Sequence, residues 1–263
     1  MQEHLDLIRL PIFLGFLLAL ILLEAIFPRL SRQHSRRQRW SINFVFGALN
    51  ILVVRLLLPV GLVGYALWLE AQAWTVNLTA VLPLPLWAET LICLILLDLI
   101  IYGQHRLLHS VPWLWRLHKM HHSDQDLDTS SALRFHPFEA AFSLGVKLAA
   151  ITALGATAQT VILFEILLSS FALFNHANWF LRGMDAKLRR LLVTPDMHRI
   201  HHRAIDHTTS GNFGFCLSVW DRLFSSYQET LNEAEMSTLK LGLTSESQHV
   251  ESLPALMRSP FSH

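Results

Sequence analysis

The sequence predicts an all-α fold: an integral membrane helical bundle of about four to five spans or a re-entrant hairpin, with a cytoplasmic helical cap. Of the 263 residues, 52% are hydrophobic and only 16% are charged, whereas soluble domains are roughly 45–50% apolar. The apolar residues are also collected into long runs. A run of about 20 such residues is long enough to cross the hydrocarbon core of a bilayer as a helix.

The first apolar run, residues 8–27, is interrupted only by Arg9, Pro11 and Glu24. A cleaved signal peptide is the competing interpretation, but no small-residue cleavage site follows the run. The next segment, residues 28–40, carries five arginines and no acidic residue. Short loops rich in Arg and Lys remain on the cytoplasmic side of a membrane, so we expect this loop there.

Two further spans are expected at residues 44–68, which contain Pro59, and at residues 86–102. The connection between them, residues 70–85, has no Lys or Arg and suits the outer side. It contains a glycosylation sequon at Asn77, which is meaningful only in a eukaryotic secretory context.

The last apolar stretch, residues 140–174, is long enough for two short tilted spans or for a re-entrant hairpin. Gly155, Thr157 and Gln159 mark the expected turn. In either form the chain returns to the side that it left. The segments before and after this stretch are therefore both expected on the cytoplasmic face.

Histidines are concentrated in these flanking segments. Of the fifteen histidines, eleven lie between His105 and His207, and the pattern HxxHH occurs twice, at residues 118–122 and 198–202. Positions i, i+3 and i+4 share one helix face. Each copy is therefore expected to aim three imidazoles at one point.

Two additional positions complete the predicted cluster. His105 and His109 form an i, i+4 pair at the end of the third span, and His176 ends the last apolar stretch. Imidazole is a common ligand for iron, zinc, copper and nickel. We predict a site for two metal ions with four or five ligands each, which suits iron. The nine candidate ligands are His105, His109, His118, His121, His122, His176, His198, His201 and His202.

The competing interpretation is that these histidines are interfacial residues beside Arg and Lys, but two HxxHH copies and an HxxxH pair favour metal ligands. Four other histidines are interpreted as solvated surface residues: His4, His34, His249 and His263. Three tryptophans are expected in an interfacial aromatic belt: Trp113, Trp115 and Trp179.

Carboxylates are expected beside the ligands, because they orient metal-bound imidazoles and offset the charge of the ions. The candidates are Asp98, Glu139, Asp196 and Asp206. Asp98 lies in the third span, seven residues before His105, and acids inside membranes are costly and usually functional. His136 and His207 are each a ligand or a hydrogen-bond partner of one, and we favour the second role.

We expect the chain to divide into N-terminal membrane helices at residues 1–97, a domain at 98–227 that carries the candidate metal site, and a C-terminal tail at 228–263, predicted to be helical or partly disordered and without chemistry. The net charge of +1 gives no argument for nucleic-acid binding. The two cysteines, Cys93 and Cys216, form neither a disulfide framework nor a CxxC metal pair.

At these residues the chain resembles the fatty acid hydroxylase superfamily, which includes sterol desaturases and sterol C4-methyl oxidases. The resemblance runs from about Asp98 to Tyr227. Its motifs are Asp98-x6-His105-Arg106-x2-His109, His118-x2-His121-His122, Arg134-x-His136-Pro137-x-Glu139, Asn175-His176-x-Asn178, His198-x2-His201-His202, Asn212-Phe213-Gly214 and Trp220-Asp221-Arg222-Leu223-Phe224. Within these motifs Asn178 and Asn212 are further candidates for positions beside the metals. Some members have another histidine where this chain has Ala172, so we expect that a further ligand is either absent or supplied by water, Asn178 or His207.

The resemblance implies a four-helix-like membrane anchor under a cytoplasmic helical cap, and two iron ions in a non-haem centre that uses O2. The expected function is hydroxylation or desaturation of a lipid, such as a sterol or a fatty acyl chain. Electrons are expected from a separate protein of the ferredoxin/reductase or cytochrome b5 kind, since the chain lacks CxxCH, a Rossmann glycine motif and ferredoxin-like cysteines.

Two alternatives remain at this point: a zinc-dependent membrane lipid hydrolase, and a metal transport or storage protein. The first meets the difficulty that catalytic zinc usually has three protein ligands. The second predicts polar residues through several spans, and these are sparse here. Zinc is also expected as a possible substitute for iron in the isolated protein. The expected location is a bacterial inner membrane, with the metal site on the cytoplasmic face.

Overall fold

The computed structural model describes residues 2–72, 84–204, 211–243 and 252–261. Throughout these residues the regular structure is helical, and β pairing is limited to isolated bridges. The prediction of an all-α fold is confirmed. The long helices are α1 (Gln2–Ile26), α2 (Arg36–Leu57), α3 (Gly61–Ala71), α4 (Leu86–Ser110), α5 (Pro112–His122), α6 (Pro137–Leu154) and α7 (Ala158–His176).

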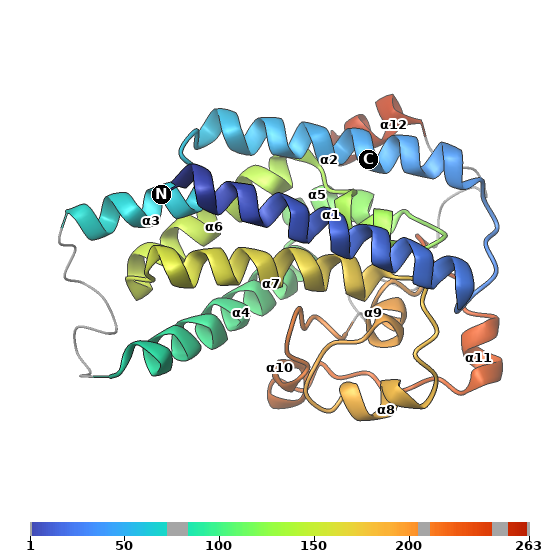
Figure 1. The fold of residues 1–263 in the computed structure, drawn as a ribbon. Coiled ribbons are helices and arrows are strands. Elements are labelled where there is room, and N and C mark those ends of the chain that lie inside the picture. The colour runs from blue at the N-terminus through green and yellow to red at the C-terminus, as the bar shows by residue number, and fades with distance from the viewer. Residues whose placement is uncertain (1, 73–83, 205–210, 244–251, 262–263) are drawn as a thin grey trace.

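The long helices run side by side and turn back at two opposite ends of the bundle (Figure 1). Five helical stretches in the described residues are long and apolar enough to cross a membrane: Ile8–Ile26, Arg36–Ala71, Leu86–Ser110, Pro137–Leu154 and Ala158–His176. Their outer surfaces remain apolar, since Leu18, Leu22 and Leu56 are 61%, 61% and 71% exposed. Such surfaces suit lipid contact, and the chain is an integral membrane protein.

The second predicted span consists of two helices rather than one. Pro59 follows the end of α2, and Gly61, the first residue of α3, has a positive φ of 66°. Because proline has no N–H to donate and restricts the residue before it, the helix is interrupted there.

The stretch at residues 140–174 forms the two helices α6 and α7. Gly155 ends α6 in the left-handed conformation with a φ of 62°, and the Thr157 hydroxyl caps α7 by accepting the Thr160 N–H at 3.2 Å. The helices have 18 and 19 residues, which corresponds to about 27 Å each. Each is therefore long enough to be a short span, and the turn lies where the sequence places it.

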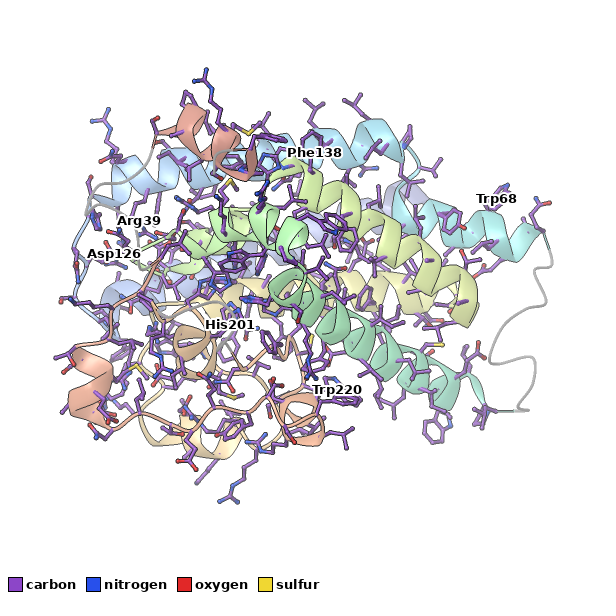
Figure 2. All side chains as sticks on the ribbon, turned by 180° about the vertical axis from the view of Figure 1, so that it is seen from behind. Arg39, Trp68, Asp126, Phe138, His201 and Trp220 are labelled. Carbon is purple, nitrogen blue, oxygen red and sulfur yellow. The ribbon has the colours of Figure 1, made fainter. Side chains whose placement is uncertain are left out.

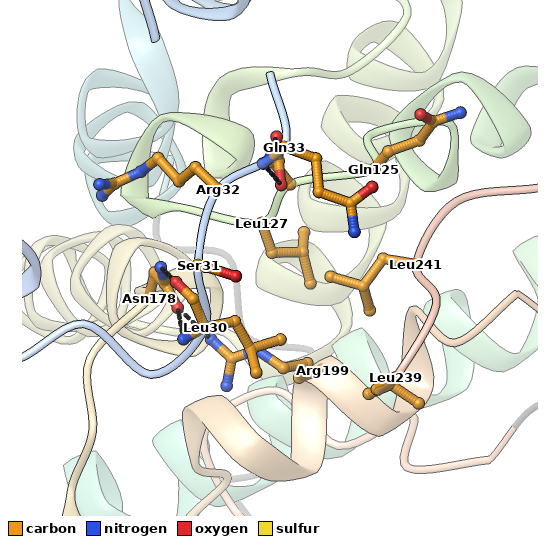
Figure 3. Close-up of a pocket in the computed structure, with 11 residues that line it drawn as sticks. Leu30, Ser31, Arg32, Gln33, Gln125, Leu127, Asn178, Arg199, Leu239 and Leu241 are labelled. Atoms are coloured by element: carbon orange, nitrogen blue, oxygen red, sulfur yellow. Dashed lines mark hydrogen bonds between the residues drawn. The ribbon is translucent and has the colours of Figure 1, made fainter. Parts of the chain in front are cut away.

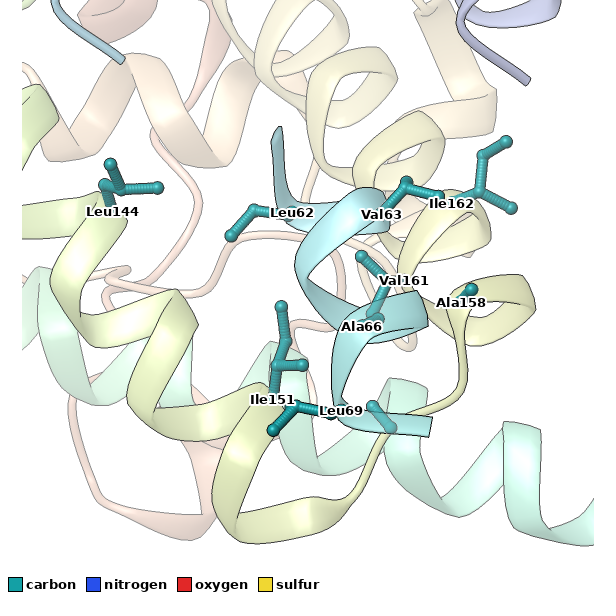
Figure 4. Close-up of a cluster of buried hydrophobic side chains, with 10 residues drawn as sticks. Leu62, Val63, Ala66, Leu69, Leu144, Ile151, Ala158, Val161 and Ile162 are labelled. Carbon is teal, nitrogen blue, oxygen red and sulfur yellow. The ribbon is translucent and has the colours of Figure 1, made fainter. Parts of the chain in front are cut away.

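A hydrophobic cluster joins α3, α6 and α7 (Figure 4), and α3 lies at the end of the bundle opposite α9 (Pro195–His201) (Figure 1). Leu62 and Ala66 of α3 pack with Ile151 of α6 and Val161 of α7. These side chains are all less than 9% exposed. This packing fixes α6 and α7 relative to α3, and so fixes where their opposite ends meet.

Short helices form a cap at that opposite end (Figure 1). They are α8 (Asp185–Leu188), α9 (Pro195–His201), α10 (Val219–Leu223) and α11 (Glu233–Ser237). The last described segment contains α12 (Leu253–Arg258) and the 3-10 turn η4 (Ser259–Phe261), and an earlier 3-10 turn, η1 (Thr129–Leu133), follows α5. The described parts of the predicted tail are thus folded. Asn77 lies outside the described residues.

Candidate metal centre

Nine buried imidazoles meet at the boundary between the bundle and the cap, where Figure 2 shows His201. Eight of them come from α4, α5, α7 and α9, and the ninth, His202, directly follows the last residue of α9 as its C-cap. Each of the nine is at most 8% exposed. All nine candidate ligands predicted from the sequence are therefore brought together.

The nine side chains form two groups, and within each group the potential ligand atoms all lie within 4.8 Å of one another. The first group has five members: His105, His109, His118, His122 and His201. The second group has four members: His121, His176, His198 and His202. We call them the five-histidine group and the four-histidine group.

Each HxxHH motif is divided between the two groups. His118 and His122 belong to the five-histidine group, whereas His121 belongs to the four-histidine group. The prediction that each motif aims three imidazoles at one point is wrong. With 3.6 residues per turn, positions i+3 and i+4 point about 100° apart, so adjacent histidines face different centres.

Hydrogen bonds at Nδ1, the ring nitrogen nearer the backbone, fix the direction of five imidazoles. Nδ1 lies 2.9 Å from the Phe213 carbonyl in His105, 3.2 Å from the Arg134 carbonyl in His121 and 2.7 Å from the Ala172 carbonyl in His176. Carbonyl and carboxylate oxygens only accept, so Nδ1 carries the proton and Nε2 keeps its lone pair. The same arrangement holds His118 to Glu139 and His201 to the Gly211 carbonyl, both at 2.8 Å.

The lone pairs that result face one another. Nε2 of His176 lies 3.0 Å from Nε2 of His121, although both rings carry their proton on Nδ1. Two lone pairs at this separation repel each other unless a cation or a proton lies between them. Nε2 of His118, His122 and His201 likewise has no hydrogen-bond partner despite being buried. The donor set therefore fits metal ions.

Burial keeps these imidazoles in the neutral form that binds metal. Burial is the largest cause that lowers the pKa of His121, His122, His198 and His202 well below the usual value, and neighbouring imidazoles lower it further. The pKa of His201 is lowered to about 3, again mainly by burial. No proton has to leave these rings before a cation binds at neutral pH.

Of the predicted carboxylates, Glu139 lies beside a candidate ligand, at 2.8 Å from His118 Nδ1. Asp98 instead accepts hydrogen bonds from the Cys216 and Leu217 N–H groups at 3.0 and 3.1 Å and from Trp220 Nε1 at 2.8 Å. It holds the loop that contains Phe213. Asp98 therefore acts on the histidines through this loop rather than by touching them.

The other predicted neighbours are bound elsewhere. Asp196 pairs with Arg199 at 2.6 Å and with Arg29 at 3.0 Å. The Asn178 amide bonds the Leu30 backbone through both its oxygen and its nitrogen, and the oxygen also accepts from Arg199 at 3.4 Å. Its polar atoms are thus already used, which argues against a role as a ligand.

Asn212 has a positive φ of 57°, and its side-chain oxygen accepts the Gln228 N–H at 2.9 Å. Its place is a turn beside Gly211, whose carbonyl holds His201. His136 caps α6 and contacts the C-terminal segment. Asp206 and His207 lie outside the described residues.

Sequence reasoning missed a buried charge network behind the first motif. Arg39 donates to Asp124 at 2.7 and 2.8 Å and to Asp128 at 2.8 Å, and all three side chains are at most 2% exposed. Burial alone raises the pKa of Asp124, but the paired Arg39 guanidinium outweighs this and lowers it well below its usual value. The signal in the sequence is the alternation of Asp124, Asp126 and Asp128 directly after the motif, opposite the arginines of residues 28–40.

Aromatic side chains also line the centre. Phe135 stacks on His121 with ring centroids 4.3 Å apart and an angle of 12° between the rings. Trp115 lies 5.0 Å from His109 and 5.3 Å from His122. Trp115 thus packs against the five-histidine group, and its predicted place in an interfacial belt stays a prediction. Trp113 is 61% exposed, as an interfacial residue requires.

A pocket lies beside the second motif, between the α1–α2 connection and the cap (Figure 3). Arg199 and Asn178 line it together with Leu127 and Leu241, and its volume is about 20 Å³. A cavity of this size holds a water molecule rather than an alkyl chain.

The fatty acid hydroxylase family model matches residues 90–226. That is more than half of the chain and includes all nine histidines. The chain belongs to the fatty acid hydroxylase family. This membership confirms the resemblance seen in the motifs.

Several characterised members of the family are similar to the chain. The ornithine lipid hydroxylase OlsE of Rhizobium tropici is 26% identical over 178 residues, which are 68% of this chain and 52% of the relative. Human alkylglycerol monooxygenase is 28% identical over 54% of this chain and 30% of the relative. The very-long-chain aldehyde decarbonylase GL1-11 of rice is 27% identical over 59% of this chain and 60% of the relative. The chain thus spans between about a third and three fifths of these relatives, and no solved structure matches it significantly.

Proposed function

We propose that the chain is a membrane-bound non-haem di-iron oxygenase that hydroxylates or desaturates a lipid, using O2 and electrons from a separate donor protein. One observation carries the proposal: nine buried imidazoles form groups of five and four, with unprotonated nitrogens of His121 and His176 facing each other. Two similar family members are named as a lipid hydroxylase and a lipid monooxygenase. Bound iron supplies the activation of O2.

The protein's own residues prepare the centre in three ways. The five histidines would hold one ion and the four histidines the other, with Glu139 and backbone carbonyls fixing the rings. The buried carboxylates Asp124 and Asp128 are near enough to His176 to act on it electrostatically, and they offset positive charge. Phe135 and Trp115 cover ligand rings and keep bulk water from them.

The position of the centre favours a substrate that stays in the bilayer. The histidines lie at the ends of α4 and α7, and α2 starts at this same end of the bundle, directly after the arginine-rich residues 28–40 (Figure 1). By the positive-inside rule this is the cytoplasmic end, here of an inner membrane. A lipid reaches the centre laterally, with its apolar chain remaining among the spans.

The test is O2-dependent product formation by the purified, iron-loaded full chain in lipid nanodiscs. Ornithine lipids, alkylglycerols and a sterol are offered separately with a ferredoxin and its reductase. We expect one class to gain oxygen or a double bond, and expect about two irons per chain. The double variant His121→Ala/His201→Ala removes one ligand from each group and should abolish the product.

Three outcomes would overturn the proposal: full activity in that double variant, product without O2, or activity of the zinc-loaded chain in the absence of any electron donor. The last outcome would support a zinc-dependent lipid hydrolase instead. Metal uptake into sealed vesicles by the chain would support transport.

A further inference from the structure

The C-terminal segment, residues 252–261, packs against the helix that carries the first HxxHH motif. Leu256 is fully buried against Ile42 and Phe46 of α2 and Met120 of α5. The turn η4 also lies along α5. The segment therefore touches α5 at Met120, the residue directly before the candidate ligand His121.

The same segment reaches the start of α6 through His136, which is 1% exposed. His136 Nδ1 accepts the Phe138 N–H at 3.2 Å, so this nitrogen carries no proton. The proton is then on Nε2, which lies 3.3 Å from the Met257 carbonyl and donates to it. One neutral imidazole thus caps α6 and ties it to the C-terminal segment.

The first turn of α6 carries Glu139, which is 3% exposed and accepts from His118 Nδ1 at 2.8 Å. A helix turn is stiff, so fixing its first residues fixes the place of this carboxylate. The tie at Met257 and the packing of Leu256 therefore hold both partners of the Glu139–His118 hydrogen bond: α6 through His136, and α5 through Met120.

We propose that the C-terminal segment is a strap that positions the Glu139–His118 pair, with His136 as the positioning residue that transmits its hold to α6. The proposal rests on the proposed function to the extent that His118 is a metal ligand. It assigns a role at the metal centre to a segment outside the family match at residues 90–226.

The first test detaches the strap without touching the centre. Leu256→Asp places a charge at a fully buried position, and Ala255→Asp places the same charge at the neighbouring exposed position as a matched control. The full chain in detergent is loaded with ferrous iron, or with cobalt(II) as an optical probe, and the rate of metal release to a chelator is measured. Mutating a hydrogen-bond partner of a metal ligand lowers metal affinity roughly 10–100-fold. We therefore expect about tenfold faster metal release for Leu256→Asp and no change for Ala255→Asp.

A double-mutant cycle separates the relay from a general loss of stability. If the strap acts through Glu139, Leu256→Asp adds less than about twofold to the release rate once Glu139→Ala is present, because coupled residues are not additive. Additive effects would show that the strap supports the fold alone, and would overturn the proposal. An unchanged release rate in Leu256→Asp itself would overturn it as well.

His136 provides a second, gentler test. Asparagine is a favoured N-cap residue, so His136→Asn keeps the cap of α6, but its shorter side chain does not reach the Met257 carbonyl. We expect His136→Asn to release metal as fast as Leu256→Asp while retaining the helix content of the parent. Release at the parental rate would overturn the proposal that His136 transmits the hold of the strap to α6.

Amide hydrogen exchange provides a readout that needs neither metal nor activity. The first turn of α6 and the end of α5 should exchange faster in Leu256→Asp than in Ala255→Asp. If the chain binds metal but oxidises no lipid, the proposed function fails and the release assay still tests the strap. If the chain binds no metal, only the exchange experiment remains, and equal exchange in the two variants would overturn the strap.

Discussion

The two HxxHH motifs are identical in pattern but are held in different ways. In the first motif, Nδ1 of His118 donates to a carboxylate and Nδ1 of His121 donates to a backbone carbonyl. In the second motif, a backbone carbonyl binds His201, and the Nε2 atoms of His198 and His202 lie 3.1 Å from each other. Helix length differs as well, since α5 has 11 residues and α9 has 7.

The charged side chains around the two motifs differ as well. The first motif has a buried ion network behind it, in which Arg39 joins two aspartates. The second motif contains its own arginine, Arg199, which binds Asp196 and the Ala177 carbonyl. Helix α5 packs along α4 and the turn η4, whereas α9 packs against α7 and is tied to the following loop through the Gly211 carbonyl. The same local sequence pattern is therefore held in place by different tertiary contacts at the two motifs.

The largest expected effect tests how the motifs are shared between the groups. His121→Ala/His198→Ala removes two ligands from the four-histidine group only and leaves the five-histidine group complete, whereas His118→Ala/His121→Ala removes one ligand from each group. We expect the first double variant to keep about one metal ion per chain and the second, which retains four and three ligands, to keep more. Metal analysis after loading and desalting measures this, and both variants should lose more than about 100-fold in activity, since even partners of ligands are worth roughly 10–100-fold.

The opposite order of metal contents would show that each motif forms its own site. The single variants give a further check. His121→Ala should resemble His198→Ala in its cobalt spectrum, because the two residues share the four-histidine group although they come from different motifs.

This division shows what the sequence could and could not reveal. The nine histidines, the turn near Gly155 and the shared end of the spans follow from spacing and hydropathy, which are local properties. Helical periodicity shows that adjacent histidines of a motif point about 100° apart. Which histidines from the other helices complete each group depends on how distant parts of the chain pack, and no periodicity in one segment contains that packing.

Asp98 shows the same limit. Its helical spacing from His105 correctly predicts a buried acid, but an acid at a buried position bonds whichever donors are nearest. Here these donors are the N–H groups of Cys216 and Leu217 and the Trp220 indole, more than 100 residues later. Arg39 and Asp124 were missed for a related reason, because the alternating aspartates do not show which arginine, here 85 positions away, they pair with.

The second prediction concerns the ion network behind the first motif. Arg39→Met leaves Asp124 and Asp128 buried without their cation, and breaking such a pair costs about 3–5 kcal/mol of unfolding free energy. Arg199→Met at the second motif leaves Asp196 paired with Arg29, so we expect a smaller loss of about 1–3 kcal/mol. Denaturant unfolding in detergent measures both.

Arg37→Met, at an exposed position of the same helix as Arg39, is the control and should be neutral. Equal losses for Arg39→Met and Arg199→Met would contradict the difference in support between the two motifs.

The third prediction concerns the loop that supports the second motif and His105. Asp98→Asn keeps one acceptor oxygen but replaces the other with a donor that opposes either the Cys216 N–H, or both the Leu217 N–H and the Trp220 indole N–H. We expect a loss of about 1–3 kcal/mol, typical of a buried donor left without its acceptor. Hydrogen exchange at residues 211–217 should accelerate, while exchange at the end of α5 stays as in the parent. Acceleration at both places would mean that the loop also supports the first motif.

The smallest expected effect concerns the outer support of the second motif. Glu233 of α11 pairs with Arg29 at 2.8 Å, but its side chain is 75% exposed, and Arg29 keeps Asp196 as a partner. Exposed pairs contribute about 0–1 kcal/mol, so Glu233→Gln should shift the unfolding free energy by less than about 1 kcal/mol and leave metal release unchanged. A release rate raised as much as in Leu256→Asp would mean that α11 holds the second motif as residues 252–261 hold the first. Both motifs would then be supported by the C-terminal tail, the first by residues 252–261 and the second by α11.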